Sequence, residues 1–270
     1  MSYRELKATE TAATIFEDFL ARLEGQINDP KIDRNDLVRN TLHEIYYGES
    51  PNIEQLYNHK YPAAARAVIA SFDPRNVTME PEYYVDIEAE HYMPRKPLIW
   101  LWQMFDRSPL GGNLLLALRF RQMLAPYIFR QVGKNFKCFH FVEWSFGYNL
   151  VIGDNVTIHR NVLLDDRGEI FIGNNVSISD YANIYSHSHD VNDIHDVTCK
   201  PTIIEDGVRL TYHSTVLAGL TIGHNGMVGA MALATRDVKP GHVNVGIPAK
   251  SILVKSVSPP HDEKVGLDQK

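Results

Sequence analysis

A short segment of the chain concentrates side chains that can transfer protons or bind a metal ion. It reads YSHSHDVNDIHD from Tyr185 to Asp196, so histidine and aspartate make up half of it. A neutral imidazole, with a pKa of about 6.5, can accept the proton of a hydroxyl group while that group attacks an electrophilic carbon. Several histidines close together can instead bind zinc. The residue types therefore predict either acid–base catalysis or a metal site in this segment.

The segment interrupts a sequence pattern with a period of six residues. Neither an α-helix nor an alternating strand has this period, whereas a parallel β-helix built from six-residue units does. Three units form one triangular coil, so we expect Ile204 to stack on Ile222 and Leu210 to stack on Val228. Gly and Asn at the corners, as in residues 153–155, are expected to supply turn conformations that other residues tolerate poorly. The pattern ends at Ala234, six residues after Val228. Its aliphatic residues are Ile152, Ile158, Leu164, Ile172, Ile178, Ile184, Ile204, Leu210, Val216, Ile222 and Val228.

The spacing of the pattern also predicts where the chain leaves the coil. Ile184 and Ile204 are 20 residues apart where six would suffice, so the other 14 residues are expected to form a loop. Loops held by a rigid scaffold are common places for catalytic groups. The segment from Tyr185 to Asp196 lies in this loop, which makes it the first candidate for an active site.

The first half of the chain has helical periodicity instead. It predicts a helix over residues 3–23 that ends near Gly25, and a second helix that starts after Asp33 as its N-cap and stops at Gly48. Further helices are predicted over the two ranges 62–71 and 113–130, and the proline-containing residues 72–97 predict loops and short extended pieces.

Two groups of side chains in the helical half have competing interpretations. The apolar group fits buried packing better than a substrate-facing or membrane-facing patch; it consists of Trp100, Trp102, Met104 and Phe105. The basic group of the last helix fits a packing helix better than a surface for an anionic substrate or membrane; it consists of Arg119, Arg121 and Arg130.

The two halves together predict a mainly β protein, a β-helix with an α-helical N-terminal region. We expect a helical region of unknown role over residues 1–130, the β-helix over 131–256 and a C-terminal tail over 257–270. The glycines support this division, since 13 of the 17 lie at or after Gly133.

Composition excludes several classes of protein. The net charge of −6 argues against nucleic-acid binding driven by bulk charge. No apolar run approaches the roughly 18 residues that a membrane helix needs, although membrane association is not excluded. Cys138 and Cys199 cannot form a disulfide framework, and the first residues lack the pattern of a signal peptide. We therefore expect a cytoplasmic protein.

Three motifs resemble those of a known family. They are IGDNV at 152–156, TIG at 221–223 and VGIPAK at 245–250. These residues are similar to the hexapeptide-repeat, left-handed β-helix acyltransferases, most of all to sugar O-acetyltransferases such as the galactoside and maltose enzymes. The resemblance covers residues 130–254. It implies a left-handed coil, acetyl-CoA as co-substrate, a homotrimer and transfer of an acetyl group to a hydroxyl of a sugar or polysaccharide precursor, with no metal required.

The resemblance also suggests residues for the acceptor side of the reaction. Ser-His189-Asp190 matches the family segment in which a histidine acts as general base, and His187 is the second choice for that role. Asp165 and Asp166 are candidates, with His187, to bind substrate hydroxyls; the alternative is a polar turn where the coil slips by two residues. Because only Cys199 lies near the histidines, direct transfer without an acyl-enzyme is favoured.

The donor side is predicted near the C-terminal end of the repeats. By resemblance, Ala230 and Thr235 would contact the pantetheine arm of the coenzyme and Arg236 would bind a phosphate. Lys250 is a second candidate for a phosphate, with an exposed charge at the end of the coil as the alternative.

Two rival functions remain open. Eight of the twelve histidines lie from His140 to His242, so a zinc enzyme of the γ-carbonic anhydrase type is one rival. Its candidate ligands are His187, His189, His195 and His213. The other rival is a noncatalytic scaffold that uses the β-helix to form a trimer.

Overall fold

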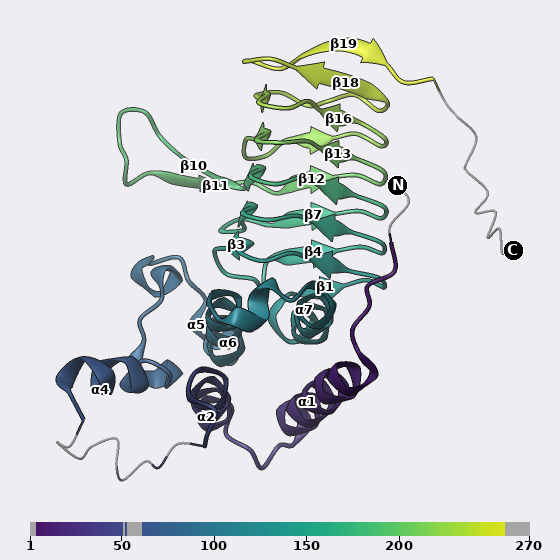
Figure 1. Ribbon diagram of the computed structural model, residues 1–270. Helices are drawn as coiled ribbons and strands as arrows, with labels where there is room; N and C mark the ends of the chain where they lie inside the picture. The colour runs from purple at the N-terminus through teal and green to yellow at the C-terminus, as the bar shows by residue number, and fades with distance from the viewer. Residues whose placement is uncertain (1–3, 51, 53–60, 257–270) are drawn as a thin grey trace, which may run out of the picture.

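The computed structural model describes residues 4–50, 52 and 61–256, and all structural statements refer to these residues. Helices lie against one end of a parallel β-solenoid whose coils stack away from them (Figure 1). The predicted tail, residues 257–270, lies outside the described residues. Within the described part of the chain, no helix is long and apolar enough to cross a membrane.

Each of the four predicted helices is present, with shifted ends, and the described residues contain two further α-helices, α5 and α6. Thr9 caps the first helix, and Gly25 lies inside it instead of ending it, because Leu23 and Ile27 on either side are both buried. Asp33 is confirmed as an N-cap, since its side chain accepts from the N–H groups of residues 35 and 36. The helices are α1 (Glu10–Asn28), α2 (Arg34–Tyr47), α4 (Ala63–Ala70), α5 (Ala89–Tyr92), α6 (Lys96–Arg107) and α7 (Leu114–Ile128).

The stretch predicted as loops and extended pieces, which the structure describes in full, consists of loops with short helical turns between them, and no β-strand lies in it. Its 3₁₀ turns are η1 (Pro74–Asn76) and η2 (Glu80–Tyr83), and η3 (Pro109–Gly112) follows α6. Pro97 occupies the first turn of α6, where a missing N–H costs nothing, so it starts a helix where a loop was expected. Trp102 and Phe105 are fully buried in α6, which confirms the packing interpretation of the apolar group.

Three parallel sheets form the faces of the solenoid. The first sheet consists of β1 (Gln131–Val132), β4 (Leu150–Ile152), β7 (Ile170–Ile172), β12 (Thr202–Ile204) and β15 (Thr221–Ile222). The second consists of β2 (Lys137–Cys138), β5 (Thr157–Ile158), β8 (Ser177–Ile178), β13 (Arg209–Leu210), β16 (Met227–Val228), β18 (His242–Val245) and the antiparallel β19 (Lys250–Val254). The third consists of β3 (Glu143–Trp144), β6 (Leu163–Asp165), β9 (Asn183–Tyr185), β14 (Thr215–Val216) and β17 (Leu233–Ala234).

The predicted stacking is confirmed for the later coils. Ile204 pairs with Ile222 and Leu210 pairs with Val228, 18 residues along the chain. In the earlier coils the pairing residues are 20 apart, as in Ile152 with Ile172, because each of these coils is two residues longer. A first coil precedes the periodic region; aromatic and sulfur-containing side chains fill its interior, namely Phe136, Cys138 and Trp144.

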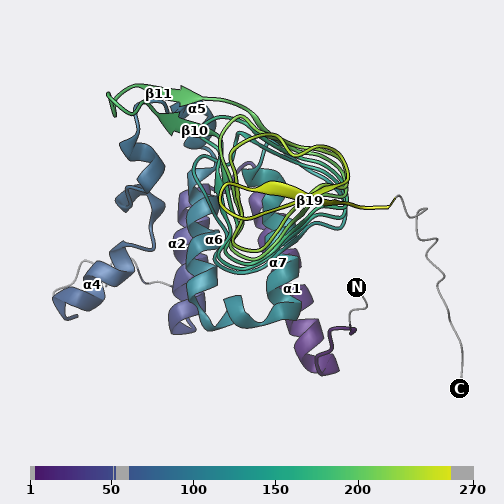
Figure 2. The same ribbon diagram turned by 90° about the horizontal axis from the view of Figure 1, so that it is seen from above.

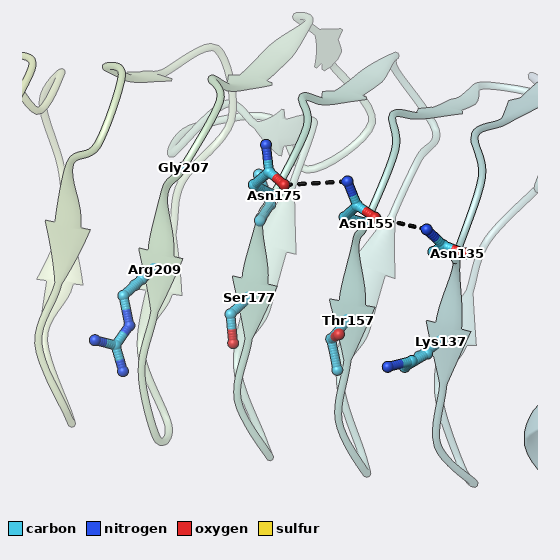
Figure 3. A pocket seen from close by; sticks show the side chains of 9 residues that line it. Asn135, Lys137, Asn155, Thr157, Asn175, Ser177, Gly207 and Arg209 are labelled. Atoms are coloured by element: carbon cyan, nitrogen blue, oxygen red, sulfur yellow. Dashed lines mark hydrogen bonds between the residues drawn. The ribbon is translucent and has the colours of Figure 1, made fainter. Parts of the chain in front are cut away.

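Asparagine and glycine have different roles at the corners. Asn155 and Asn175 adopt the left-handed backbone conformation, with φ of 57° and 56°, and their side-chain amides form a ladder with Asn135 along the solenoid (Figure 3). Gly153 has no positive φ; a Cβ atom there would lie 2.8 Å from the carbonyl carbon of Gly173 in the next coil. The expectation that Gly153 supplies an unusual turn conformation is therefore wrong. Glycine is required at this position because two coils approach each other closely there.

Replacing Gly153 with alanine is expected to lower the free energy of unfolding by about 1–3 kcal/mol, because the added methyl group forces two coils apart. Gly25→Ala is the control: nothing lies within 4 Å of its added Cβ, and alanine should stabilise the α1 interior by about 0.5–1 kcal/mol. Denaturant unfolding of both variants measures the two effects. Equal shifts in the same direction would contradict the close-approach explanation.

The helices join the solenoid through a buried ion pair. Arg121 of α7 donates to Asp106 of α6 at 2.6 and 2.9 Å and to the carbonyl oxygen of Cys138 in the first coil at 3.2 Å. The second carboxylate oxygen of Asp106 accepts from the N–H of Phe141 at 2.8 Å. The packing interpretation therefore holds for Arg121, whereas Arg119 and Arg130 are exposed and form surface ion pairs with Glu17 and Glu169.

Candidate active site

The predicted loop is a two-stranded hairpin that projects from the solenoid (Figures 1 and 2). Its strands are β10 (His187–His189) and the antiparallel β11 (Val197–Cys199), with His187 opposite Cys199. The hairpin leaves the coil after β9 and returns at β12, so it projects from the edge between the third and first sheets. Asp190 shapes the turn, because its carboxylate accepts from the N–H groups of residues 192 and 193.

His187 contacts Asp165 at the base of the hairpin. The contact joins Nδ1 of the imidazole to Oδ2 of the carboxylate. Asp165 is buried, and its other oxygen accepts from the hydroxyl of Ser145 at 3.0 Å. The structure therefore brings together two of the predicted acceptor-side residues, and the aspartate orients the imidazole of His187.

Ser186 fixes the hairpin to the preceding coil, although the sequence did not single it out. The side chain is fully buried; its hydroxyl donates to the carbonyl oxygen of Asp165 and accepts from the N–H of Gly168 at 2.9 Å. The carbonyl oxygen of Ser186 accepts from the N–H of Lys200, where the hairpin returns. A serine next to a histidine is a weak sequence signal, because the role of Ser186 depends on a turn about 20 residues earlier in the chain.

Asp166 lies inside the protein. Its carboxylate accepts from the N–H groups of Phe146 and Gly147 at 2.7 and 2.6 Å, and the residue is fully buried. Burial raises the pKa of Asp166 to about 7, against the lowering effect of these two N–H groups. The contacts match the interpretation of a structural polar turn, in which Asp166 holds the corner of the first coil beneath Asp165.

The raised pKa of Asp166 predicts a pH dependence of stability. In the unfolded chain an aspartate has a pKa of about 3.9, so the folded state binds the proton of Asp166 more tightly than the unfolded state does. The stabilisation that this proton gives is complete only below about pH 4. The free energy of unfolding should fall as pH rises to about 7, by up to about 1.4 kcal/mol per pH unit. Asp166→Asn removes this component. Denaturant unfolding of both proteins at pH 5, 6 and 7 measures it, and parallel pH profiles would exclude a titration of Asp166 in this range.

His189 is oriented so that one of its two ring nitrogens can accept a proton. Nδ1 lies 2.6 Å from the carbonyl oxygen of Ile194 across the hairpin turn. A carbonyl oxygen only accepts, so Nδ1 bears the hydrogen and Nε2 of the neutral ring keeps its lone pair. His189 is exposed, and its ring lies 5.2 Å from that of His187. The arrangement can remove a proton from a hydroxyl group that approaches the hairpin.

The four histidines of the metal hypothesis are divided between two places. His187, His189 and His195 belong to the hairpin, whereas His213 follows β13 at another corner and stacks on Tyr181 at 4.7 Å. Across residues 4–50, 52 and 61–256, the candidate metal-binding group comprises Glu88, Glu90 and His91, all exposed, and none of the four histidines belongs to it.

The predicted donor residues lie at two corners of the last coils. Thr235 and Arg236 follow β17, two coils beyond β9, so they lie on the same edge as the hairpin and about 10 Å further along the axis. Ala230 follows β16 and Lys250 begins β19, at the corner on the other side of the third sheet. All four residues are exposed.

A polar groove lies on a different face from the hairpin. It runs along the second sheet and is lined by Lys137, Thr157, Ser177 and Arg209, beside the asparagine ladder (Figure 3). None of the predicted catalytic or donor residues lines it. The groove and the hairpin are therefore separate surfaces of the solenoid.

Comparison with known proteins places the chain in a family. No protein-family model matches it. It is 30% identical over 138 residues to the galactoside O-acetyltransferase of Escherichia coli, a match that covers 49% of this chain and 67% of the relative. A galactoside acetyltransferase solved in complex with coenzyme A is 25% identical, with a TM-score of 0.55 over 63% of this chain and 84% of that chain.

A second solved structure covers more of the chain. It is a hexapeptide-repeat acetyltransferase of Vibrio cholerae complexed with acetyl coenzyme A, 25% identical, with a TM-score of 0.55 over 68% of this chain and 99% of that chain. The six-residue repeat, the parallel solenoid and these similarities agree with one another. The protein is therefore a member of the hexapeptide-repeat acetyltransferases.

Proposed function

We propose that this protein transfers the acetyl group of acetyl-CoA to a hydroxyl of a sugar or polysaccharide precursor, with His189 as general base. The observation that carries the proposal is the imidazole of His189, whose Nδ1 is held by a carbonyl oxygen while Nε2 is left to accept a proton. The similarity to a galactoside O-acetyltransferase supports the acceptor class, and relatives solved with coenzyme A or acetyl coenzyme A support the donor.

The reaction needs no covalent enzyme intermediate. Nε2 of His189 takes the hydroxyl proton as the acceptor oxygen attacks the thioester carbonyl, and a backbone N–H at a coil corner would stabilise the oxyanion. When the tetrahedral intermediate collapses, the carbon–sulfur bond breaks and the imidazolium returns its proton to the thiolate. The ester and free coenzyme A are the products. Asp165 orients His187, which would bind a substrate hydroxyl beside the base.

The donor would lie along the edge that holds Thr235 and Arg236. The guanidinium of Arg236 is exposed and can bind a phosphate in a bidentate manner, with Lys250 as a second cation. The backbones of Ala230 and Thr235 would contact the pantetheine arm. Because the hairpin projects from the same edge, a thioester bound there can reach His189.

The assembly and location belong to the same proposal. A homotrimer would pair the flat faces of the solenoid and bring the hairpin of one subunit to the donor edge of another. The helical region over residues 1–130 would act as a separate element that closes the first coil and lies beside the acceptor. We propose a cytoplasmic location, where acetyl-CoA is available.

A coupled assay of thiol release tests the function. The purified protein is incubated with acetyl-CoA and a panel of mono- and oligosaccharides, with acetyl-CoA alone as the measure of hydrolysis. Thiol release that depends on a sugar, together with acetylated sugar in the mass spectrum, is the expected result. The rate should be unchanged by EDTA, whereas loss of activity on chelation would favour the metal enzyme. Binding of acetyl-CoA without turnover on any hydroxyl acceptor would refute the proposal.

A further inference from the structure

The helical region presents one segment to the active site. Residues 80–90, here called the wall segment, comprise η2 and the residues that lead into α5. Arg167, two residues after Asp165, donates to both carboxylate oxygens of Asp86 at 3.0 and 3.1 Å. Its guanidinium also lies 4.5 Å from the centre of the Tyr84 ring. The side chain of Arg167 is only 8% exposed, so this contact fixes the wall segment to the solenoid.

A second contact fixes the other end of the wall segment. The N–H of Glu88 donates to the hydroxyl of Tyr148 at 2.9 Å. Tyr148 stacks on Phe146, whose N–H is bound by the buried carboxylate of Asp166. The wall segment is therefore held by the same coil corner that carries Asp165, the partner of the hairpin histidine.

The wall segment is close to the base of the hairpin. Burial raises the pKa of the Cys199 thiol; the charges of Asp86 and Asp165 also raise it, whereas the charge of Arg167 lowers it. Cys199 lies opposite His187 in the hairpin. Figures 1 and 2 both show the hairpin and α5, into which the wall segment leads, on the same side of the solenoid.

Two aromatic rings of the wall segment are available to a ligand. Tyr83 is 84% exposed, and its ring meets that of Tyr84 edge-on at 5.9 Å. Tyr84 is half-buried and fixed in place, since its hydroxyl donates to Glu80 at 2.7 Å and Arg167 lies over one face of its ring. The C–H faces of a sugar ring pack well on rigid aromatic side chains, which combine an apolar surface with a polar edge.

Carboxylates outnumber lysines and arginines around the acceptor side. The wall segment contains five carboxylates and no lysine or arginine, and residues 187–199 of the hairpin contain three carboxylates, three histidines and again no lysine or arginine. Lys96 pairs with Glu82 and Arg167 pairs with Asp86, whereas the other carboxylates of the wall segment have no lysine or arginine partner among the ion pairs of the described residues. A ligand that brings a further negative charge here meets repulsion, which discriminates against it.

We propose that the wall segment selects the acceptor, with Tyr83 and Tyr84 packing against a sugar ring and the surrounding carboxylates restricting it to neutral or amino sugars over sugars that carry a carboxylate. This proposal rests on the proposed function and names the class of its acceptor. The wall segment acts on binding and orientation, while proton transfer stays with the hairpin.

Three matched pyranosides test the proposal: a glucoside, a glucosaminide and a glucuronide. With acetyl-CoA as donor, we expect kcat/KM for the first two to exceed that for the glucuronide by about tenfold or more at low ionic strength, and salt should narrow the difference. Tyr83→Ala should raise the KM for the glucoside about 3- to 10-fold and leave the KM for acetyl-CoA unchanged. The triple variant Glu80→Gln, Glu88→Gln, Glu90→Gln should reduce the discrimination against the glucuronide.

Ile15→Ala provides the matched control, since Ile15 is an exposed apolar residue on α1, outside the wall segment. Saturation-transfer NMR with the same three sugars measures binding without turnover. Equal saturation of glucoside and glucuronide, or unchanged glucoside binding in Tyr83→Ala, overturns the wall-segment proposal even if acetyl transfer occurs. The predicted order of binding without any acetyl transfer supports the wall segment as a sugar-binding surface and refutes the proposed function instead.

Discussion

Replacing His189 with alanine is expected to lower kcat for acetyl transfer by a factor of about 10²–10⁴, the usual contribution of a general base. The KM for acetyl-CoA should change little, because the imidazole meets the acceptor hydroxyl and not the coenzyme. The variant should fold normally, since His189 is exposed and its hydrogen bond to Ile194 lies in a hairpin outside the core. The thiol-release assay gives both parameters.

Two further histidine variants make this result specific. His195→Ala is the control, because His195 belongs to the same hairpin and is exposed. His187→Ala should have a smaller effect on kcat than His189→Ala, since His187 is bound by Asp165. Added imidazole should restore part of the activity of His189→Ala, which a purely structural role would not allow. Full activity of His189→Ala, with a large loss in His187→Ala, would assign the base to His187 instead.

Replacing Arg121 with alanine is expected to lower the free energy of unfolding by about 3–5 kcal/mol. The side chain is 1% exposed and its partner Asp106 is 3% exposed, so the variant leaves a buried carboxylate without its cation. The carbonyl oxygens of Cys138 and Gly111 lose their donor as well. Denaturant unfolding at neutral pH measures the loss.

Arg119→Ala is the matched control for this prediction. Arg119 lies on the same helix, two residues earlier, and pairs with Glu17 at the surface. An exposed ion pair of this kind contributes about 0–1 kcal/mol. If both variants lost the same stability, the helix itself and not the buried pair would account for the effect.

The solenoid could be predicted from the sequence because its interior repeats. Each coil has three sides, and each side places one aliphatic side chain in the interior. The sequence pattern therefore continues for as long as small aliphatic residues fill the interior. The aliphatic pattern does not extend to the first coil, where Phe136, Cys138 and Trp144 fill the interior, although the predicted range of 131–256 includes this coil. The loop was predicted by counting residues alone, since 14 more residues than a coil needs must leave it. Their pairing into a hairpin depends on cross-strand contacts that the count does not contain.

The contacts of the candidate site required the structure. His187 and Asp165 are 22 positions apart, and only the stacking of two coils brings them together. Helix α6 was hidden for a different reason, because prolines indicate loops in sequence and Pro97 instead begins a helix. Nothing in the sequence shows that Arg121 is buried, because arginine is usually exposed and its partner comes from another helix.

The buried pair of Arg121 and Asp106 supplies hydrogen bonds that a preceding coil would supply at the start of the solenoid. In each later coil the N–H equivalent to that of Phe141 donates to the carbonyl oxygen of the preceding coil, as Tyr181 does to Arg160. At the first coil, Asp106 supplies the acceptor and Arg121 supplies a donor for Cys138. At the opposite end, β19 runs antiparallel and closes the second sheet. The corner of the first coil thus faces helices and not an open sheet edge, which hinders the stacking of a second solenoid on that end.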